Sequence, residues 1–242
     1  MNLVIDIGNT RVKTAVFKEN TMLNNDSLNL VNFSDHVDKI IQKYPIKHVI
    51  ISSVGDFNDK FIDFFDPSVK VCTLTHRTKI PFSNEYKTPK TIGVDRIALI
   101  AASVHKFPNT RVLVIDAGSC ITYDFVNDEK QYFGGSISPG IKMRYKALNS
   151  FTNNLPHLSA VNQIPIFGDS TQNAIHIGVL NGVIQEIEGV ISQFKSKYKK
   201  LTVVLTGGDT IFLAKNIKST IFANPNFLLE GLNSILIFNK DV

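Results

Sequence analysis

A short sequence that occurs twice is the feature that most constrains the fold. Residues 3–8 read Leu-Val-Ile-Asp-Ile-Gly, and residues 113–118, nearly half the chain later, read Leu-Val-Ile-Asp-Ala-Gly. In each copy an apolar run ends in Asp, a Gly follows two residues later, a hydroxyl residue comes soon after, and a second apolar run follows. The pattern predicts two related halves, or else two strand-turn-strand units that converged on one sequence.

Apolar runs bounded by turn residues predict an α/β chain. Strands are expected at 3–5, 12–17, 48–52, 69–74, 112–115, 121–126 and 201–205, and the clearest helices at 35–43, 95–105 and 173–194. Because the second strand follows the first after a short turn, the two should form a hairpin, and the sheet should therefore be mixed. With 242 residues the chain can form one large domain or two smaller ones.

The composition excludes several classes of protein. With 43% hydrophobic and 19% charged residues, the chain is neither disordered, collagen-like nor a disulfide scaffold. The net charge is only +5, and the densest basic cluster ends a helical stretch, where cations are favoured. We therefore expect no nucleic-acid binding and favour anionic small molecules. Cys72 and Cys120 lack the spacing of a metal site and are interpreted as core residues.

The N-terminal sequence and the apolar runs bear on localisation. Asp6 interrupts the first apolar run, so no signal-peptide core is present, and no stretch approaches the ~20 apolar residues of a membrane span. We expect a cytoplasmic protein that binds no membrane.

The segment Asp6–Lys13 has the composition of a phosphate-binding turn. Gly8 lets the backbone approach a ligand, successive N–H groups can bind an anion, and Asn9 and Thr10 add side-chain donors. Asp6 would hold the divalent metal that accompanies a nucleotide, and Lys13 would supply a positive charge. The alternative is an ordinary hairpin, and neither the P-loop motif GxxxxGK[ST] nor GxGxxG is present.

The second copy repeats this chemistry at residues 116–119, Asp-Ala-Gly-Ser. Two such turns facing one cleft would hold a triphosphate from both sides. Residues 206–209, Thr-Gly-Gly-Asp, follow an apolar strand and precede a helix, where bare backbone would accept the flat face of a nucleoside. A plain turn is the alternative for this segment.

Asp95 is the candidate general base. It follows Gly93 and Val94 at the start of an expected helix, where the positive end of the helix dipole favours an ionised carboxylate. The alternative is an ordinary capping residue. The histidines lie in neither an HExxH nor a GxSxG motif, so metalloprotease and serine-hydrolase chemistry have no support.

Six motifs together resemble the type III pantothenate kinases over nearly the whole chain. They are DIGNTRVK at 6–13, GVDR at 93–96, DAGSCIT at 116–122, GGSISPGIKM at 134–143, GDST at 168–171 and TGGD at 206–209. The resemblance implies the actin-like acetate-and-sugar-kinase superfold, with two ribonuclease-H-like domains of mixed sheets, 1–110 and 111–242, flanking a nucleotide cleft. It implies ATP-dependent phosphorylation of pantothenate to 4′-phosphopantothenate, the first step of coenzyme A biosynthesis.

The resemblance also implies roles for individual residues. It implies ATP binding by Asp6, Ile7, Gly8, Asn9, Thr10, Arg11, Val12, Lys13 and Ser119, and pantothenate binding by Tyr86, Gly93, Val94, Asp95, Arg96 and Thr171. By the same resemblance Asp95 accepts the proton, Asp116 binds a monovalent cation, K⁺ or NH₄⁺, and Mg²⁺ accompanies ATP. The family is homodimeric, and Thr171 is expected to reach the site of the neighbouring protomer.

Two departures from the family pattern and two rival functions stay open. Ser119 stands where the family has Thr and keeps the hydroxyl, and Val94 replaces an Ala beside Asp95. Arg96 is either a ligand of the substrate's charge or a member of a structural ion pair. The rivals are a non-catalytic regulator of transcription and a sugar or acetate kinase on the same scaffold; retention of Asp6, Asp95 and Asp116 favours the enzyme.

Overall fold

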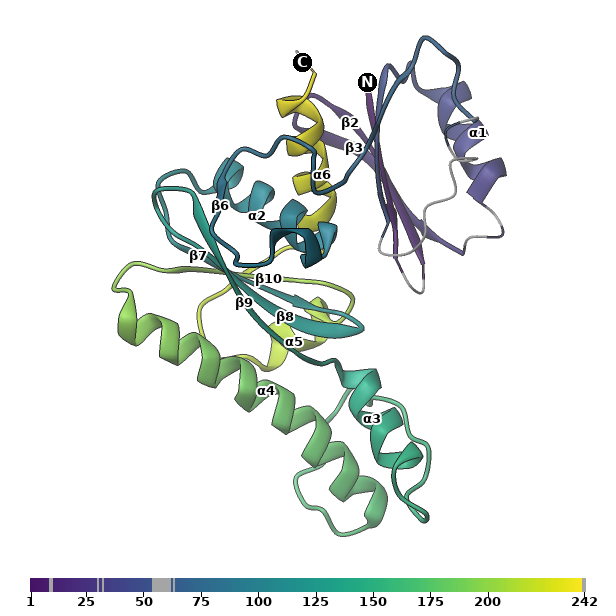
Figure 1. Cartoon of the computed structure of the whole chain (residues 1–242). Helices are drawn as coiled ribbons and strands as arrows, with labels where there is room; N and C mark the ends of the chain where they lie inside the picture. The colour runs from purple at the N-terminus through teal and green to yellow at the C-terminus, as the bar shows by residue number, and fades with distance from the viewer. Residues whose placement is uncertain (9–10, 30, 32, 54–61, 63, 241–242) are drawn as a thin grey trace. The chain divides into compact units, whose positions relative to one another are not determined.

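Two compact units make up the chain in this computed structural model, which describes residues 1–8, 11–29, 31, 33–53, 62 and 64–240 (Figure 1). The first unit contains Met1–Pro108, Lys130–Tyr132 and Asn226–Val242. The second contains Asn109–Glu129 and Phe133–Pro225. The units meet close to the predicted boundary at residue 110, but the C-terminal segment lies with the first unit rather than the second.

A five-stranded mixed sheet forms the centre of the first unit. Its order is β3-β2-β1-β4-β5, with β1 antiparallel to β2 and parallel to β4. The strands are β1 (Asn2–Ile7), β2 (Val12–Lys18), β3 (Thr21–Leu28), β4 (His48–Ser53) and β5 (Lys70–Thr73). The β1–β2 hairpin and the mixed sheet confirm the sequence prediction.

Helices cover both faces of this sheet. Alternate residues of the strands, including Leu3 and Ile5, pack against the buried side of α1 (Phe33–Lys43). On the other face, α2 (Val94–Lys106) and α6 (Phe227–Phe238) contact the sheet and each other. Gly231 allows that close packing, because a Cβ there would lie 1.9 Å from the Ala98 carbonyl oxygen. The packing of α6 explains why the C-terminal segment belongs to the first unit.

The second sheet has the order β11-β10-β7-β8-β9-β6. Its strands are β6 (Ser83–Asn84), β7 (Val112–Ala117), β8 (Cys120–Val126), β9 (Gln131–Pro139), β10 (Thr202–Thr206) and β11 (Phe222–Ala223). Strand β6 and the first residues of β9 are grouped with the first unit, which also holds the short helix η3 (Pro89–Thr91). The helices of the second unit are α3 (Ile141–Ser150), α4 (Thr171–Lys197) and α5 (Thr210–Asn216).

Helix α4 provides much of the core of the second unit. Its buried residues, among them Val183 and Ile187, pack against the sheet face that carries Leu113, Ile115 and Tyr123. In length and mean hydropathy α4 meets the criteria for a membrane-spanning helix, and 44% of its most apolar 18-residue window is buried. The core helix of a globular unit meets the same criteria, because it too presents a long apolar face.

The two sheets share one strand plan. The order β3-β2-β1-β4-β5 corresponds to β9-β8-β7-β10-β11, beyond which the second sheet adds β6 next to β9. In both sheets the central strand, β1 or β7, is antiparallel to one neighbour (β2 or β8) and parallel to the other (β4 or β10). The repeated sequence therefore occupies equivalent strands, β1 and β7. This supports the prediction of two related halves over that of a chance match.

Candidate active site

The first unit places Asp6 at the carboxyl end of β1. Its carboxylate is only 6% exposed and lies between two neighbours in register, Lys13 on β2 and Ser52 on β4. The Gly8 N–H, after the end of β1, donates to the Arg11 carbonyl, before the start of β2, at 3.1 Å. Of the predicted ATP loop, Asn9 and Thr10 lie outside the described residues.

Burial dominates the electrostatics of Asp6. The pKa of this carboxyl is raised from 3.8 to about 6, because burial raises it more than Lys13 lowers it; the negative charge of Asp95 adds to the rise and the Ser52 hydroxyl opposes it. Asp6 and Asp95 therefore lie close enough to repel each other. The sequence separates them widely, and the contact of α2 with the sheet brings them together.

Asp95 belongs to the first turn of α2. Gly93 is the N-cap residue, and no side-chain hydrogen bond caps this helix within the described residues. The Asp95 carboxylate instead accepts from the Arg96 backbone N–H at 2.8 Å. A Cβ at Gly93 would lie 2.3 Å from Asp95 Oδ1, so any larger residue at position 93 would clash with the carboxylate in this position. Asp95 is thus not an ordinary N-cap, and its partial exposure leaves it accessible to a hydroxyl group.

Tyr86 and Arg96 form a second part of this site. The Arg96 side chain is 5% exposed, and its guanidinium lies 5.8 Å from the centre of the Tyr86 ring. Tyr86 in turn stacks on Tyr132, with 6.4 Å between ring centres. The structure therefore brings together the two residues that were predicted, from separate segments, to contact the substrate, and it gives Arg96 a cation–π partner.

The second unit repeats the aspartate at the end of β7. Asp116 has Thr122 opposite it on β8 and Thr206 beside it on β10. The Thr122 hydroxyl is buried and has no hydrogen-bond partner among the described residues. The following turn is closed by the Gly118 N–H, which donates to the Cys120 carbonyl at 2.9 Å.

Gly207 packs directly against Asp116 and Ala117. Its φ of +96° favours glycine, and a Cβ there would lie 2.4 Å from Asp116 Oδ1 and 2.3 Å from the Ala117 carbonyl oxygen. The Asp209 N–H donates to that carbonyl at 3.0 Å. The TGGD segment is therefore packed against the second aspartate rather than forming an isolated turn.

Ser119 and the start of α3 complete this part of the second unit. The Gly140 N–H donates to the Ser119 carbonyl at 3.2 Å, and a Cβ at Gly140 would lie 2.2 Å from the Gly118 carbonyl oxygen. Lys142, two residues on, offsets part of the rise that burial causes in the pKa of Asp209. Three glycine-containing segments thus converge around the exposed Ser119.

Comparison with known proteins identifies the family. The family model for type III pantothenate kinase matches residues 2–193. Type III pantothenate kinases from Christiangramia forsetii and Flavobacterium johnsoniae are 45% and 43% identical, over 99% and 100% of this chain and 99% of each relative. The chain belongs to the type III pantothenate kinase family.

Solved structures show the fold of this kinase family member. A Baf family protein from Campylobacter jejuni has a TM-score of 0.64 and 22% identity, over 99% of this chain and 100% of that chain. A glucokinase from an Antarctic psychrotroph has a TM-score of 0.53 and 12% identity, over 98% and 99%. These matches, with two mixed sheets, confirm the predicted actin-like and sugar-kinase superfold.

Within the kinase, Thr171 is the one predicted substrate residue that lies in the second unit. It is exposed at the first position of α4, where Ser170 caps the helix by accepting from the Asn173 N–H at 3.2 Å. Tyr86, Asp95 and Arg96 all lie in the first unit. Participation of Thr171 in a neighbouring protomer's site therefore stays a prediction.

Sequence reasoning missed the hydroxyl residues beside the two aspartates. Ser52 and Thr206 each end an apolar strand, and each lies next to an aspartate in register. Aligning the fourth strand of each half, once the repeat was noticed, would have found this pair. Among the described residues no group of three or more His, Cys, Asp or Glu side chains is placed to hold a metal; a metal here would depend on ligand phosphates and on hydroxyl or carbonyl oxygens.

Proposed function

We propose that this chain transfers the γ-phosphate of ATP to the 4′-hydroxyl of pantothenate, giving 4′-phosphopantothenate and ADP, the first step of coenzyme A biosynthesis. The family match carries the proposal, and the first unit supports it with two carboxylates, Asp6 and Asp95, whose charges act on each other. One carboxylate ends a strand beside a glycine turn and a lysine, and the other begins a helix without serving as its cap.

Asp95 is assigned as the general base. As the 4′-hydroxyl oxygen attacks the γ-phosphorus in line, its proton passes to the Asp95 carboxylate, and the bond between the γ-phosphorus and the bridging oxygen of ADP breaks. Gly93 and Val94 form the wall next to this carboxylate. Arg96 and Tyr86 hold pantothenate, with the Arg96 charge directed to the substrate carboxylate.

The glycine turn of the first hairpin is assigned to the ATP phosphates. Backbone N–H groups of the segment 7–12, apart from the Gly8 N–H that donates to the Arg11 carbonyl, would bind phosphate oxygens, with Lys13 as the nearby positive charge. The buried Asp6 carboxylate fits the oxygen preference of Mg²⁺, which supplies charge neutralisation to the triphosphate when bound. Ser119 would contact ATP from the second unit.

The oxygen groups around Asp116 fit a monovalent cation. The Asp116 carboxylate and the buried Thr122 hydroxyl, which has no hydrogen-bond partner among the described residues, suit a hard cation that prefers oxygen ligands. Bound there, K⁺ or NH₄⁺ would balance negative charge near the nucleotide. Thr122 and Thr206 would then contribute uncharged hydroxyl groups to the site.

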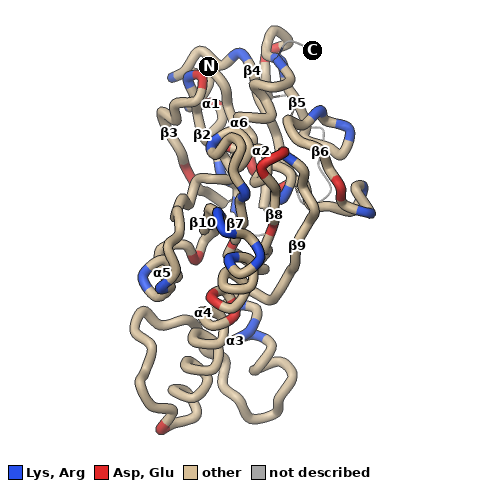
Figure 2. The backbone as a smooth tube through the Cα atoms, turned by 90° about the vertical axis from the view of Figure 1, so that its left-hand side faces the viewer, with Lys and Arg blue, Asp and Glu red and all other residues tan. Residues whose placement is uncertain are grey.

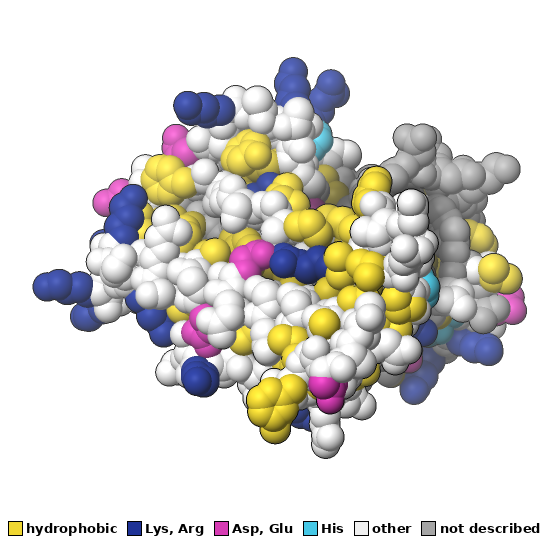
Figure 3. Space-filling model, turned by 90° about the horizontal axis from the view of Figure 1, so that it is seen from below, with side chains coloured by type: hydrophobic (Ala, Val, Ile, Leu, Met, Phe, Trp, Pro, Cys, Tyr) yellow, Lys and Arg dark blue, Asp and Glu magenta, His cyan; other side chains and the backbone are white. Residues whose placement is uncertain are grey.

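A homodimer in the cytoplasm is part of the proposal. Phe151, Ile166 and Phe167 are 88%, 86% and 75% exposed in and near the segment that leads to Thr171, and hydrophobic side chains recur over the face shown in Figure 3. A second copy that covers them would remove this apolar area from water. Light scattering coupled to gel filtration should give twice the chain mass.

Lys and Arg residues are spread over many elements and interspersed with Asp and Glu (Figure 2), which argues against nucleic-acid binding.

A substrate panel tests the proposed function. Purified protein is incubated with Mg-ATP and, separately, pantothenate, sugars or acetate, and products are identified by mass spectrometry. We expect phosphorylated pantothenate alone. Phosphorylated sugar or acetate would replace the proposal by the rival kinase activity, and ATP binding without any phosphorylated product would favour a regulator.

A further inference from the structure

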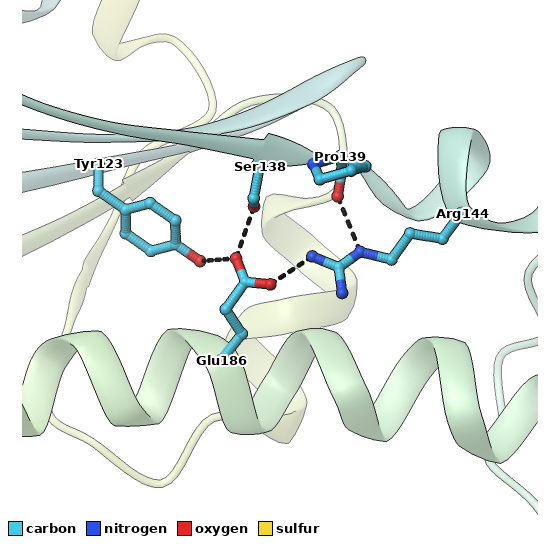
Figure 4. A network of polar contacts seen from close by, with 5 residues as sticks. All are labelled: Tyr123, Ser138, Pro139, Arg144 and Glu186. Carbon is cyan, nitrogen blue, oxygen red and sulfur yellow. Dashed lines mark hydrogen bonds and ion pairs between the residues drawn. The ribbon is translucent and has the colours of Figure 1, made fainter. Parts of the chain in front are cut away.

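Glu186 of α4 is the centre of a polar network that the proposed reaction does not use (Figure 4). The Tyr123 hydroxyl donates to Glu186 Oε1 at 2.8 Å, and the Ser138 hydroxyl donates to the same oxygen at 2.5 Å. The Arg144 guanidinium donates to Glu186 Oε2, and its Nε donates to the Pro139 carbonyl at 2.8 Å. One carboxylate thus joins α4 to β8, β9 and α3.

The network stabilises the ionised form of Glu186 and the protonated form of Tyr123. Burial alone would raise the pKa of Glu186, but hydrogen bonds from Ser138, Arg144 and Tyr123 outweigh it and lower that pKa below its ordinary value. Burial and the neighbouring Glu186 raise the pKa of Tyr123, so the phenol keeps its proton and remains a donor. Charge-assisted bonds of this kind fix geometry more strongly than neutral ones.

The network ends at the turn that contacts the nucleotide side of the second unit. Ser138 and Pro139 close β9, and Gly140, the next residue, donates to the Ser119 carbonyl at 3.2 Å. The two segments are closely packed at this contact, because a Cβ on Gly140 would come within 2.2 Å of the Gly118 carbonyl oxygen. A displacement of the Pro139–Gly140 turn would therefore displace Ser119.

We propose that Glu186 is a positioning residue for ATP: acting through Ser138 and Arg144, it holds the Pro139–Gly140 turn against Gly118 and Ser119. This inference rests on the proposed function, which assigns Ser119 to ATP. Glu186 itself touches no substrate in this assignment. Its effect is to keep a short turn, with few bonds of its own, in the conformation that ATP requires.

Glu188 supplies a matched control on the same helix. Its carboxylate accepts from the Lys218 N–H at 2.5 Å, the Ser219 N–H at 3.0 Å and the Ser219 hydroxyl at 2.6 Å. That network also joins α4 to a loop, but the loop follows the C-terminal end of α5. The Gly207 turn precedes the other end of α5, about 10 Å away along the helix.

The test compares Glu186→Gln with Glu188→Gln. Both substitutions keep side-chain size and remove the negative charge from a network of similar bonds. We expect Glu186→Gln to raise KM for ATP about tenfold, as the loss of charge-assisted bonds predicts, with KM for pantothenate and kcat changed less than about twofold. Glu188→Gln should lower the melting temperature without moving KM for ATP. Equal effects of the two variants on KM for ATP would overturn the proposal, because they would reduce Glu186 to a stabilising residue.

Arg144→Gln keeps the proposal testable if Glu186→Gln does not fold. Arg144 lies on the part-exposed side of α3, and its loss frees both Glu186 Oε2 and the Pro139 carbonyl. It should raise KM for ATP in the same direction, and unchanged KM would overturn the proposal. Calorimetric titration with a non-hydrolysable ATP analogue separates the two claims: if wild-type protein binds the analogue but phosphorylates nothing, the proposed function fails, while the dissociation constants of the variants still decide the role of Glu186.

Discussion

The two hairpins of this kinase share a backbone plan and differ in the residue that faces the aspartate. In the first, Asp6 lies opposite Lys13 on the antiparallel strand and beside Ser52 on the parallel one. In the second, Asp116 lies opposite Thr122 and beside Thr206. An ammonium group thus balances the first carboxylate, whereas the second has hydroxyl groups at both equivalent positions.

The difference shows how one strand pattern supports two kinds of ion site. In the proposed function Asp6 binds the metal–phosphate complex, and Lys13 suits that role because a lysine can contact phosphate as well as the carboxylate. Among the described residues, a buried hydroxyl without a hydrogen-bond partner lies beside each aspartate, Ser52 beside Asp6 and Thr122 opposite Asp116. The missing lysine is therefore what distinguishes the second site, and we propose that a free cation takes the place of the ammonium group there. Asp95, the proposed base, distinguishes the halves further, since it lies in the first unit.

The largest expected effect is the loss of that base. Asp95→Asn keeps the volume of the side chain and removes its proton-accepting charge, so kcat should fall by about 10²–10⁴ while pantothenate still binds. Steady-state kinetics and pantothenate titration measure the two properties. Asp35→Asn, in the first turn of α1, is the matched control and should leave kcat unchanged. Turnover of Asp95→Asn near the wild-type rate would remove Asp95 from the role of base.

The burial of Asp6 predicts a pH-dependent cost in stability. Its pKa is about 6 in the folded chain against 3.8 ordinarily, so the folded protein binds this proton more tightly than the unfolded chain. The penalty is absent below about pH 4, grows between pH 4 and 6, and reaches about 3 kcal/mol above pH 6. The difference in melting temperature between Asp6→Asn and wild type should therefore be more positive at pH 7 than at pH 4. A gain that does not change with pH would contradict the raised pKa.

Asp6→Asn should also separate nucleotide use from alcohol binding. Removing a charged ligand of the metal–nucleotide complex should lower kcat/KM for Mg-ATP about 10- to 100-fold. KM for pantothenate should change little, because the proposed partner of Asp6 is the nucleotide. Rates measured over a matrix of Mg²⁺ and ATP concentrations test this. An unchanged dependence on both would place Asp6 outside the site.

Asp116→Asn should affect the response to monovalent cations. We expect wild-type activity to need K⁺ or NH₄⁺, with Na⁺ about tenfold less effective, and the variant to lose this difference. Assays at constant ionic strength exchange K⁺ for Na⁺ or a bulky organic cation, so that screening stays the same. Equal wild-type rates in the three salts would defeat the cation site and leave the kinase activity intact.

The sequence predicted the parts of the fold that depend on local pattern. The β1–β2 hairpin, β4, β7, β8, β10 and the helices α1, α2 and α4 follow from apolar runs and turn residues. Edge strand β3 was missed because its residues are mostly exposed and polar. Helix α6 was missed because most of its residues are buried, including Asn233 and Ser234, so that no polar face marks a helical period. No local pattern indicates that α6 returns to the first unit.

The parts of the candidate site that could be predicted are those whose residues follow one another in the sequence. The turn after Asp6, the start of α2 and the Asp116 turn each lie in one short segment, and the structure places them at strand or helix ends as expected. The proximity of Asp6 to Asp95, the contact of Arg96 with Tyr86 and the role of Gly207 beside Asp116 depend on tertiary packing. These contacts join segments far apart in the chain, so spacing alone gives no signal of them.

The most direct test of the difference between the hairpins is to give the second one the lysine of the first. Thr122→Lys places an ammonium group opposite Asp116, in the register that Lys13 has opposite Asp6, and Thr122→Met supplies a long side chain without charge. Rates of pantothenate phosphorylation are measured for wild type and both variants in K⁺, Na⁺ and a bulky organic cation at one ionic strength. Wild type should be fastest in K⁺, Thr122→Lys should be active at similar rates in all three salts, and Thr122→Met should be slow in each. A Thr122→Lys enzyme that still requires K⁺ as wild type does would contradict the account.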